Sequence, residues 1–205
     1  MNFKAILKNR VFKNFSYLTI GGILSQLLAV FVVYKLTYIL DPENYGVFTF
    51  MFIQAQMIMT LSDLGIKNIL IRTISRENDK LQICFKSAFV IKILFSFLFM
   101  IIYFLYNSIY GNLTTIEVVL VCLISLLFSV NSLFESIFFG LEKMIYPTLI
   151  NLSYNIIIFI LVYIVGEQNN NIVFYFNIFL LVTLLKSLIY FITAVKNKFF
   201  RNFFS

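Results

Sequence analysis

The chain has 205 residues, of which 61% are hydrophobic, 19% aromatic and only 12% charged. A soluble domain carries about a quarter charged residues, so this composition and a mean hydropathy of +0.94 exclude an ordinary water-soluble protein and indicate a membrane protein. The net charge of +7 does not indicate nucleic-acid binding, because the basic residues are spread along the chain and do not gather on one folded surface.

Six apolar stretches are long enough, or nearly so, to cross a bilayer as helices, which takes about 20 residues each. The predicted spans are Phe15–Leu40, Tyr45–Leu64, Cys84–Tyr106, Ile116–Gly140, Tyr146–Val165 and Ile172–Val195. The second is short, because its apolar run ends at Leu61. The first is too long for a cleavable signal peptide and runs into Lys35. The predicted fold class is an all-α membrane protein, with residues 1–205 forming a single lobe of six transmembrane helices.

Basic residues predict the orientation of these spans. Apart from Lys35, Lys92 and Lys186, every Lys and Arg lies at a terminus or in, or at the edge of, a connection on one side of the membrane. The connections of the other side contain none; they are Asp41–Asn44, Asn107–Thr115 and Gly166–Asn171. Because cytoplasmic connections carry the excess of Lys and Arg, both termini are expected in the cytoplasm and the protein in the cytoplasmic membrane.

The long connection after the second span, residues 64–80, has a helical pattern of its own. Its apolar and hydroxyl face consists of Ile66, Ile69, Leu70, Thr73 and Ile74. Its basic face consists of Arg72, Arg76 and Lys80. We expect an amphipathic helix that continues the second span or lies in the interface, with the basic side chains directed at anionic lipid headgroups.

Three lysines lie within predicted spans, where a charge costs about 2.5–3.5 kcal/mol on insertion scales. Lys92 is near the cytoplasmic end of its span and is expected to extend its amine to the surface. Lys35 lies within a turn or two of the outer surface. Lys186 is ten residues, or about 15 Å, from Lys196 and is too deep to reach water easily. Glu135 lies in the same leaflet and is its candidate ion-pair partner.

Amides cluster in the same half of the membrane. Asn131 and Glu135 share a helix face at i, i+4, as do Asn151 and Asn155. Two interpretations remain open for this cluster. The amides either make interhelical hydrogen bonds, worth about 0.6 kcal/mol each, or line a polar cavity that opens to the cytoplasm together with cationic groups.

Two more helix faces have distinct patterns. Gln56, Met59 and Asp63 share one face of the second span. In the first span the small residues Gly22, Ser25 and Ala29 form a face that permits close approach of another helix.

Catalytic and metal-binding signatures are missing from the sequence. It has no histidine and no DxD, GxSxG, P-loop or HExxH pattern, so an enzyme is not expected. Cys84 and Cys122 form no CxxC pair, which argues against both a disulfide framework and a zinc site. No metal or cofactor is therefore expected.

Three segments carry a family resemblance. The stretch "NFSYLTIGGILSQLLAVFVVYKLTYILDPENYGVFTF" resembles the first-helix region of the Wzx-type oligosaccharide flippases, the polysaccharide branch of the MATE-like exporters. That family has an apolar helix ending in a basic residue and then a Leu-Gly-Pro-Glu-x-Tyr-Gly-like turn. The matching residues are Leu40, Pro42, Glu43, Tyr45 and Gly46. Two residues depart from the family pattern: Asp41 stands where glycine is usual, and Tyr38 stands where an arginine is common. Lys35 lies one helical turn before Tyr38, and the resemblance implies that it takes the role of this arginine.

The other two segments follow in the family's order. "LSDLGIKNILIRTISREND" is similar to the Leu-Gly…Arg element after the second helix, with Gly65 and Arg72 matching. "SLFESIFFGLEKMIYPTLINLSYNIIIF" is similar to the Phe-x-Gly-x-x-Lys element between the fourth and fifth helices, with Phe138, Gly140 and Lys143 matching. The resemblance covers nearly the whole chain.

This resemblance implies a function. Family members move polyprenyl-pyrophosphate-linked oligosaccharide repeat units across the cytoplasmic membrane for surface polysaccharide synthesis. Lysines would hold the pyrophosphate and amides the sugars, while the polyprenyl tail stays in lipid. The candidate substrate-binding residues are Lys35, Lys186, Glu135, Asn131, Asn151 and Asn155.

Members of this family are built from two six-helix lobes, so the chain is expected to be an N-terminal half, either truncated or paired with a second lobe or with itself. Two other functions remain open. One is a multidrug or cation exporter of the same superfamily, which the deep lysine disfavours. The other is a membrane assembly partner that transports nothing.

Overall fold

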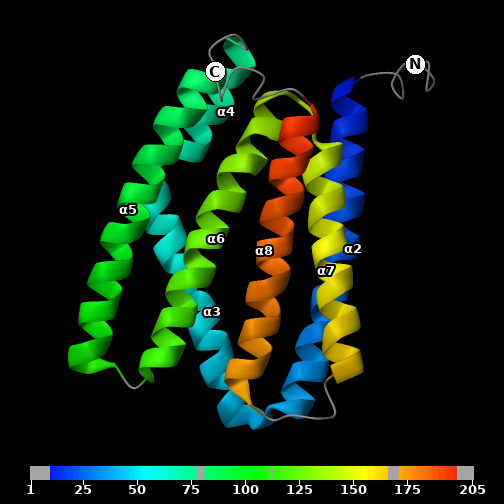
Figure 1. The fold of residues 1–205 in the computed structure, drawn as a ribbon. Coiled ribbons are helices and arrows are strands. Elements are labelled where there is room, and N and C mark those ends of the chain that lie inside the picture. The colour runs from blue at the N-terminus through cyan, green and yellow to red at the C-terminus, as the bar shows by residue number, and fades with distance from the viewer. Residues whose placement is uncertain (1–9, 78–80, 112, 166–170, 198–205) are drawn as a thin grey trace.

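The computed structural model describes residues 10–77, 81–111, 113–165 and 171–197, and every regular element in these ranges is an α-helix (Figure 1). The helices are α2 (Arg10–Ile39), α3 (Asp41–Asp63), α4 (Ile66–Arg76), α5 (Leu81–Tyr110), α6 (Thr115–Gly140), α7 (Ile145–Val165) and α8 (Ile172–Lys196). Several residues used in the predictions lie outside the described ranges. They are Lys4, Lys8, Lys80, Lys198, Arg201 and most of the connection Gly166–Asn171.

Six of these helices, all except α4, are long and apolar enough to cross a membrane. The predicted all-α membrane fold is therefore confirmed. The observed helices run past the predicted apolar stretches, most clearly at the start of α2 and at both ends of α5. Polar flanking residues continue the backbone hydrogen bonds of a helix after its apolar stretch has ended.

The connection predicted at Asp41–Asn44 is wrong. Helix α3 begins at Asp41, so these four residues are its first turn, and only Leu40 separates α2 from α3. Pro42 suits this position because the first turn of a helix needs no backbone N–H donor. Asp41 and Glu43 place negative charge at the positive end of the helix dipole. A proline and two acidic residues are equally typical of a turn and of the first turn of a helix, so the sequence did not distinguish the two.

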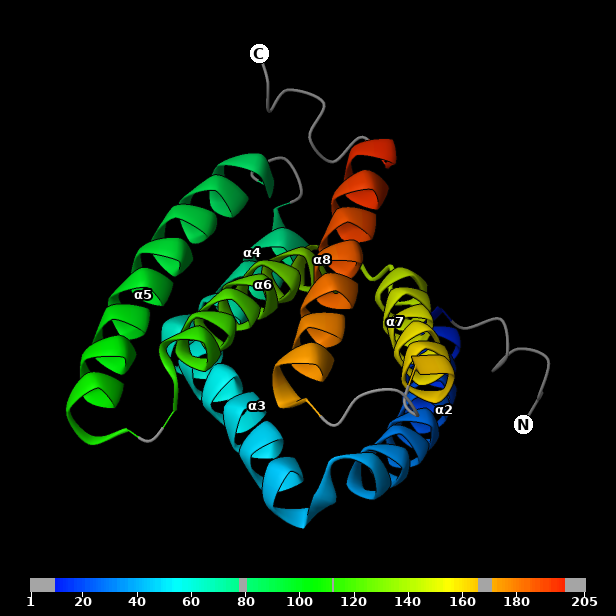
Figure 2. The same ribbon diagram turned by 60° about the horizontal axis from the view of Figure 1, so that its bottom comes forward.

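The helices form two groups joined by α8. Helices α2 and α7 lie side by side as a pair, and α6 packs against α3, α4 and α5 (Figures 1 and 2). Helix α8 packs against both α6 and α7. Helix α2 begins at the same end of the bundle at which α8 ends. We call this the basic end, because α4, with Arg72 and Arg76, also lies there.

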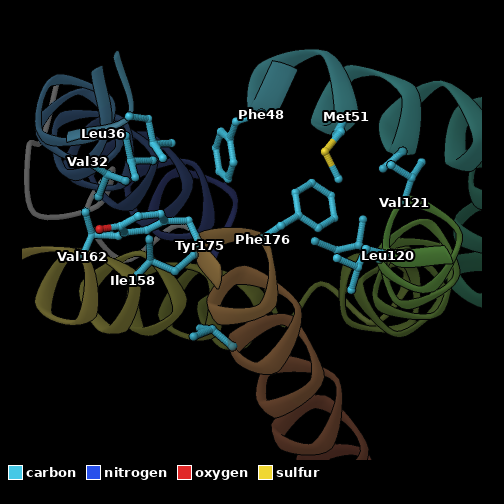
Figure 3. Packing of buried hydrophobic residues seen from close by; sticks show 14 of the residues in the cluster. Val32, Leu36, Phe48, Met51, Leu120, Val121, Ile158, Val162, Tyr175 and Phe176 are labelled. Atoms are coloured by element: carbon cyan, nitrogen blue, oxygen red, sulfur yellow. The ribbon is translucent and has the colours of Figure 1, made fainter. Parts of the chain in front are cut away.

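Two apolar clusters fill the bundle. The cluster far from the basic end joins all the long helices except α5 through buried side chains, and Figure 3 shows how α8 holds it together. Tyr175 points toward α2 and α7, whereas its neighbour Phe176 points toward α3 and α6. The ring of Phe176 lies 6.0 Å from that of Phe48, edge to face. The second cluster, at the basic end, packs Leu70 and Ile74 of α4 against α5, α6, α7 and α8.

Helix α2 approaches α7 closely at Gly21, one residue before the predicted face of Gly22, Ser25 and Ala29. A Cβ on Gly21 would collide with the side chain of Thr148 on α7. A Cβ on Gly22 would meet nothing within 4 Å. Gly22 and Ser25 line one hollow of the bundle and Ala29 lines another.

Candidate functional site

A layer of polar side chains separates the two apolar clusters. Ser62, Ser96 and Ser129, from α3, α5 and α6, are fully buried. The hydroxyl oxygen of Ser129 lies 3.2 Å from that of Ser96 and 3.3 Å from that of Ser62. These bonds satisfy hydroxyls that would otherwise be unpaired at membrane depth.

The charged part of this layer begins with Lys92 on α5. Its side chain is fully buried, and its amine donates to the carboxylate of Asp63 in an ion pair. The same amine donates to the hydroxyl of Ser132 at 3.0 Å. The prediction that Lys92 extends its amine to the surface is wrong. Asp63 at the end of α3 neutralises the amine inside the bundle.

A tight turn connects Asp63 to the next charge. Leu64 and Gly65 both have left-handed backbone conformations, with φ of 42° and 79°. Glycine accepts this conformation without a steric penalty. The turn ends α3 and starts α4, so that the backbone N–H of Lys67 donates to Asp63 at 3.4 Å. Gly65 therefore places the side chain of Lys67 next to α6.

Glu135 on α6 accepts from two other helices. Lys67 Nζ lies 2.7 Å from its Oε2, and Asn151 Nδ2 on α7 donates to its Oε1 at 3.2 Å. Asn155 Nδ2 donates to the carbonyl of Asn151 at 2.9 Å. We call the connected set of Lys92, Asp63, Lys67, Glu135, Asn151 and Ser132 the polar network. It joins α3, α4, α5, α6 and α7.

The predicted ion pair between Glu135 and Lys186 is replaced by the pair between Glu135 and Lys67. The amine of Lys186 lies 4.9 Å from the ring centre of Tyr154 on α7, in a cation–π contact. It stays within electrostatic range of Glu135 and Lys67. Lys186 thus lies beside the polar network and gives this region one positive charge in excess of its carboxylates.

Two predicted site residues lie elsewhere. Asn131 is 5% exposed and donates to the carbonyl of Thr183 at 3.5 Å, so it joins α6 to α8. Lys35 lies 5.6 Å from the ring centre of Tyr163. Tyr163 is nine residues beyond Tyr154 on α7, about 14 Å along the helix axis. Lys35 and Lys186 therefore do not belong to one binding site within this chain.

Two hollows follow the inner faces of α2 and α7. The one nearer the basic end has a volume of about 330 Å³ and is lined by Ser25, Gln26, Glu135, Asn151 and Asn155 together with apolar residues. The next, about 210 Å³, is mostly apolar and includes Gln56 and Tyr154. Asn155 lines both, so the hollows adjoin. Amides and one carboxylate line the first hollow. The amine of Lys67, whose side chain is 31% exposed, forms an ion pair with that carboxylate.

Helix α4 is amphipathic, as predicted, but its apolar face differs from the predicted one. Leu70 and Ile74 are buried, whereas Ile69 is 65% exposed. Arg72 and Arg76 are exposed at the basic end, where they are free to meet lipid headgroups, and Lys80 lies outside the described residues. Gly140 of α6 lets α4 approach closely, because a Cβ there would lie 2.8 Å from the Cβ of Ile74.

The contacts among Asp63, Lys67 and Lys92 were not predicted from the sequence. Lys67 was predicted to lie with the other basic residues in a connection on one side of the membrane, although Asp63 and Lys67 stand four residues apart around a glycine. One signal was available. Asp63 and Glu135 are the two acidic residues in the basic-end halves of the predicted spans. Each therefore needed a basic partner, and the basic residue nearest to Asp63 in the chain is Lys67, four residues later.

Comparison with known families gives one match, to the family described as polysaccharide biosynthesis protein, over residues 11–205. No curated protein and no solved structure matches the chain. The matched range includes all three segments that resemble the oligosaccharide flippases, and every residue of the polar network.

Proposed function

We propose that this chain, which belongs to the polysaccharide biosynthesis protein family, moves polyprenyl-pyrophosphate-linked oligosaccharide repeat units across the cytoplasmic membrane. Family membership and six membrane-spanning helices make it a multi-pass membrane protein with a transport role in polysaccharide synthesis. The observation that carries the finer proposal is the polar network beside the hollow along α2 and α7. It provides cations, amides and a cavity at membrane depth in one place.

Each part of the substrate has a matching group. The pyrophosphate is anionic. Lys67 is paired with Glu135, which lines the first hollow, and Lys186 contacts Tyr154, which lines the second. A pyrophosphate that enters would compete with Glu135 for Lys67, whose side chain is 31% exposed. The amides of Gln26, Asn151 and Asn155 offer both donors and acceptors to sugar hydroxyls.

The basic end is proposed to face the cytoplasm, with both termini on that side. Arg72 and Arg76 would then meet the anionic headgroups of the inner leaflet. The substrate would enter the hollow from this end, where the lining is most polar.

A second body is proposed to cover this polar face. Gln56 is exposed, and Glu135, Asn151 and Asn155 are only partly buried, at a depth where lipid offers no hydrogen bonds. Alternating access also needs two bodies that move around a shared site. The second body is a second copy of the chain or a separate lobe. Measuring the mass of the purified complex in nanodiscs distinguishes a dimer from a monomer that needs another chain.

The alternative function is export of organic cations. It has one observation in its favour, because the carboxylate of Glu135 lines the hollow together with amide oxygens. Against it, Lys67 already neutralises this carboxylate and Lys186 adds a further positive charge. Efflux of a cationic dye by cells that carry the protein, with no effect on glycan export, would favour the alternative.

A deletion strain tests the proposal. Without the protein, lipid-linked repeat units should accumulate in the inner leaflet, and expression of the wild-type chain with its natural partner should clear them. Lys67→Met should leave the accumulation in place, whereas Lys196→Met, at the exposed end of α8, should clear it. If no repeat units accumulate in the deletion strain, the flippase function is wrong. If Lys67→Met clears them as fast as wild type, only the assignment of the site is wrong.

A further inference from the structure

At the end opposite the basic end, two hollows lie next to each other between α3 and α5. One has a volume of about 700 Å³ and is lined by the carboxylates of Glu43 and Glu117, the rings of Tyr106 and Tyr110, and amide side chains. We call it the acidic hollow. The other, about 440 Å³, is lined almost entirely by apolar residues of α3 and α5, and we call it the apolar groove. Phe50, Gln54 and Tyr106 line both, so the two hollows are continuous.

We propose that this pair of hollows binds a phospholipid with an amine headgroup. The ammonium group would lie in the acidic hollow and an acyl chain in the apolar groove. This inference does not rest on the proposed transport function, because it uses no residue of the polar network and concerns the other end of the bundle.

The charges of the acidic hollow select the headgroup. Two carboxylates line it, and none of its lining residues is a lysine or arginine. The rings of Tyr106 and Tyr110 stand 5.7 Å apart and are 58% and 74% exposed, so their faces are accessible to a cation. An ammonium group meets both kinds of partner here. An anionic headgroup would meet two like charges.

The acidic hollow also contains hydrogen-bonding groups that could bind the amine and the phosphate of the headgroup. Glu117 lines the hollow and uses Oε2 to accept the backbone N–H of Thr114 at 2.8 Å, so its Oε1 is the acceptor proposed for the amine. Gln54 accepts the hydroxyl of Tyr103 at 2.5 Å through its Oε1, which leaves its amide N–H groups as donors for a phosphate oxygen. The hollow thus offers acceptors for an amine and donors for the phosphate attached to it.

The dimensions fit one leaflet. Along α5 the two hollows extend from Phe99 to Tyr110, eleven residues or about 16 Å. This is close to half of a hydrocarbon core of about 30 Å. Ile53, Met57 and Ile102, which line the groove, are each more than half exposed, so a lipid can enter sideways from the bilayer. The headgroup end of the groove is the end at which α5 meets the interface.

Native mass spectrometry of the purified protein in detergent tests the proposal. Equal amounts of dioleoyl-phosphatidylethanolamine and dioleoyl-phosphatidylglycerol, which share acyl chains and differ in headgroup, are added in competition. We expect the ethanolamine lipid to bind about fivefold to tenfold more, the effect of one cation–π contact plus one ion pair. Equal binding of the two lipids, or a preference for the glycerol lipid, would overturn the proposal.

Three variants test whether the acidic hollow and the apolar groove are the lipid-binding site. Glu43→Gln combined with Glu117→Gln removes both charges, and glutamine at position 117 keeps the capping box of α6. This variant should lose the headgroup preference, whereas Asp41→Asn, which removes a charge at the same end but outside the hollow, should retain it. Met57→Trp fills the groove from an exposed position and should weaken binding of both lipids. Retention of the preference by the double glutamine variant contradicts the proposal.

Two further measurements separate a bound lipid from other occupants. Phosphoethanolamine, the same headgroup without chains, should displace the lipid only at great excess. Displacement at equal concentration would mean that the hollow recognises a free amine, which contradicts a lipid site. A photoreactive phosphatidylethanolamine should crosslink to peptides of α3 and α5. Crosslinks confined to other helices, or lipid binding lost because a second copy covers the groove, would also overturn the assignment.

Discussion

Breaking the buried ion pair between Lys92 and Asp63 should destabilise the bundle strongly. Removing one partner of a buried pair typically costs about 3–5 kcal/mol, because the other charge stays behind without compensation. For Lys92→Met we expect about 3 kcal/mol, the low end, because Asp63 keeps the N–H of Lys67 and its side chain is 19% exposed. For Asp63→Asn we expect about 4 kcal/mol, because Lys92 is fully buried and keeps only Ser132 as a strong partner.

The double variant distinguishes an ion pair from two independent contacts. With both charges removed no buried charge is left alone, so the combined loss should be at least about 2 kcal/mol smaller than the sum of the single losses. Steric trapping in detergent measures the free energy of unfolding of all three proteins. Lys186→Met is the control and should cost about 1 kcal/mol, because its partner is an uncharged ring. Single losses that add to within about 0.5 kcal/mol would refute the pairing.

Three shorter predictions test the packing and the topology. Gly22→Ala should stabilise the protein by about 0.5–1 kcal/mol through helix propensity. Gly21→Ala should destabilise it, because of these two glycines only Gly21 is in close contact with α7. Thermal unfolding of the two variants measures the difference. Gly140→Leu should displace α4 from α6 at Ile74 and speed hydrogen exchange of α4 amides, while unchanged exchange would mean that the contact is not tight. A reporter fused after Asn112 should lie outside the cell, and an inside reading would invert the proposed orientation.

The fold was predictable because its strongest signals are local. Each long helix contains a run of apolar residues whose length is near the thickness of a bilayer. Helix ends were less predictable. Asp41 to Asn44 contain proline and acids, which suit a turn and a helix start equally, and the structure uses them to start α3.

The candidate site was predictable in part. The sequence predicted that Glu135 and Asn151 lie in the same half of the membrane, and the structure joins them by a hydrogen bond. It did not show which lysine reaches Glu135, because that depends on the left-handed turn at Gly65 and on the packing of α4 against α6. Its depth in the membrane made Lys186 the expected partner of Glu135. In the structure the amine of Lys186 instead contacts the ring of Tyr154.

Direct measurement of flipping tests the central claim most sharply. The purified protein, with its natural partner, is reconstituted into vesicles that carry a fluorescent polyprenyl-pyrophosphate-linked oligosaccharide in both leaflets, and a membrane-impermeant quencher reports the outer leaflet over time. We predict that all of the substrate becomes accessible with wild type and with Lys196→Met. Lys67→Met should slow this at least about tenfold, because one charged contact is lost. Substrate that stays half protected in wild-type vesicles, as in vesicles without protein, would contradict the proposed flippase function.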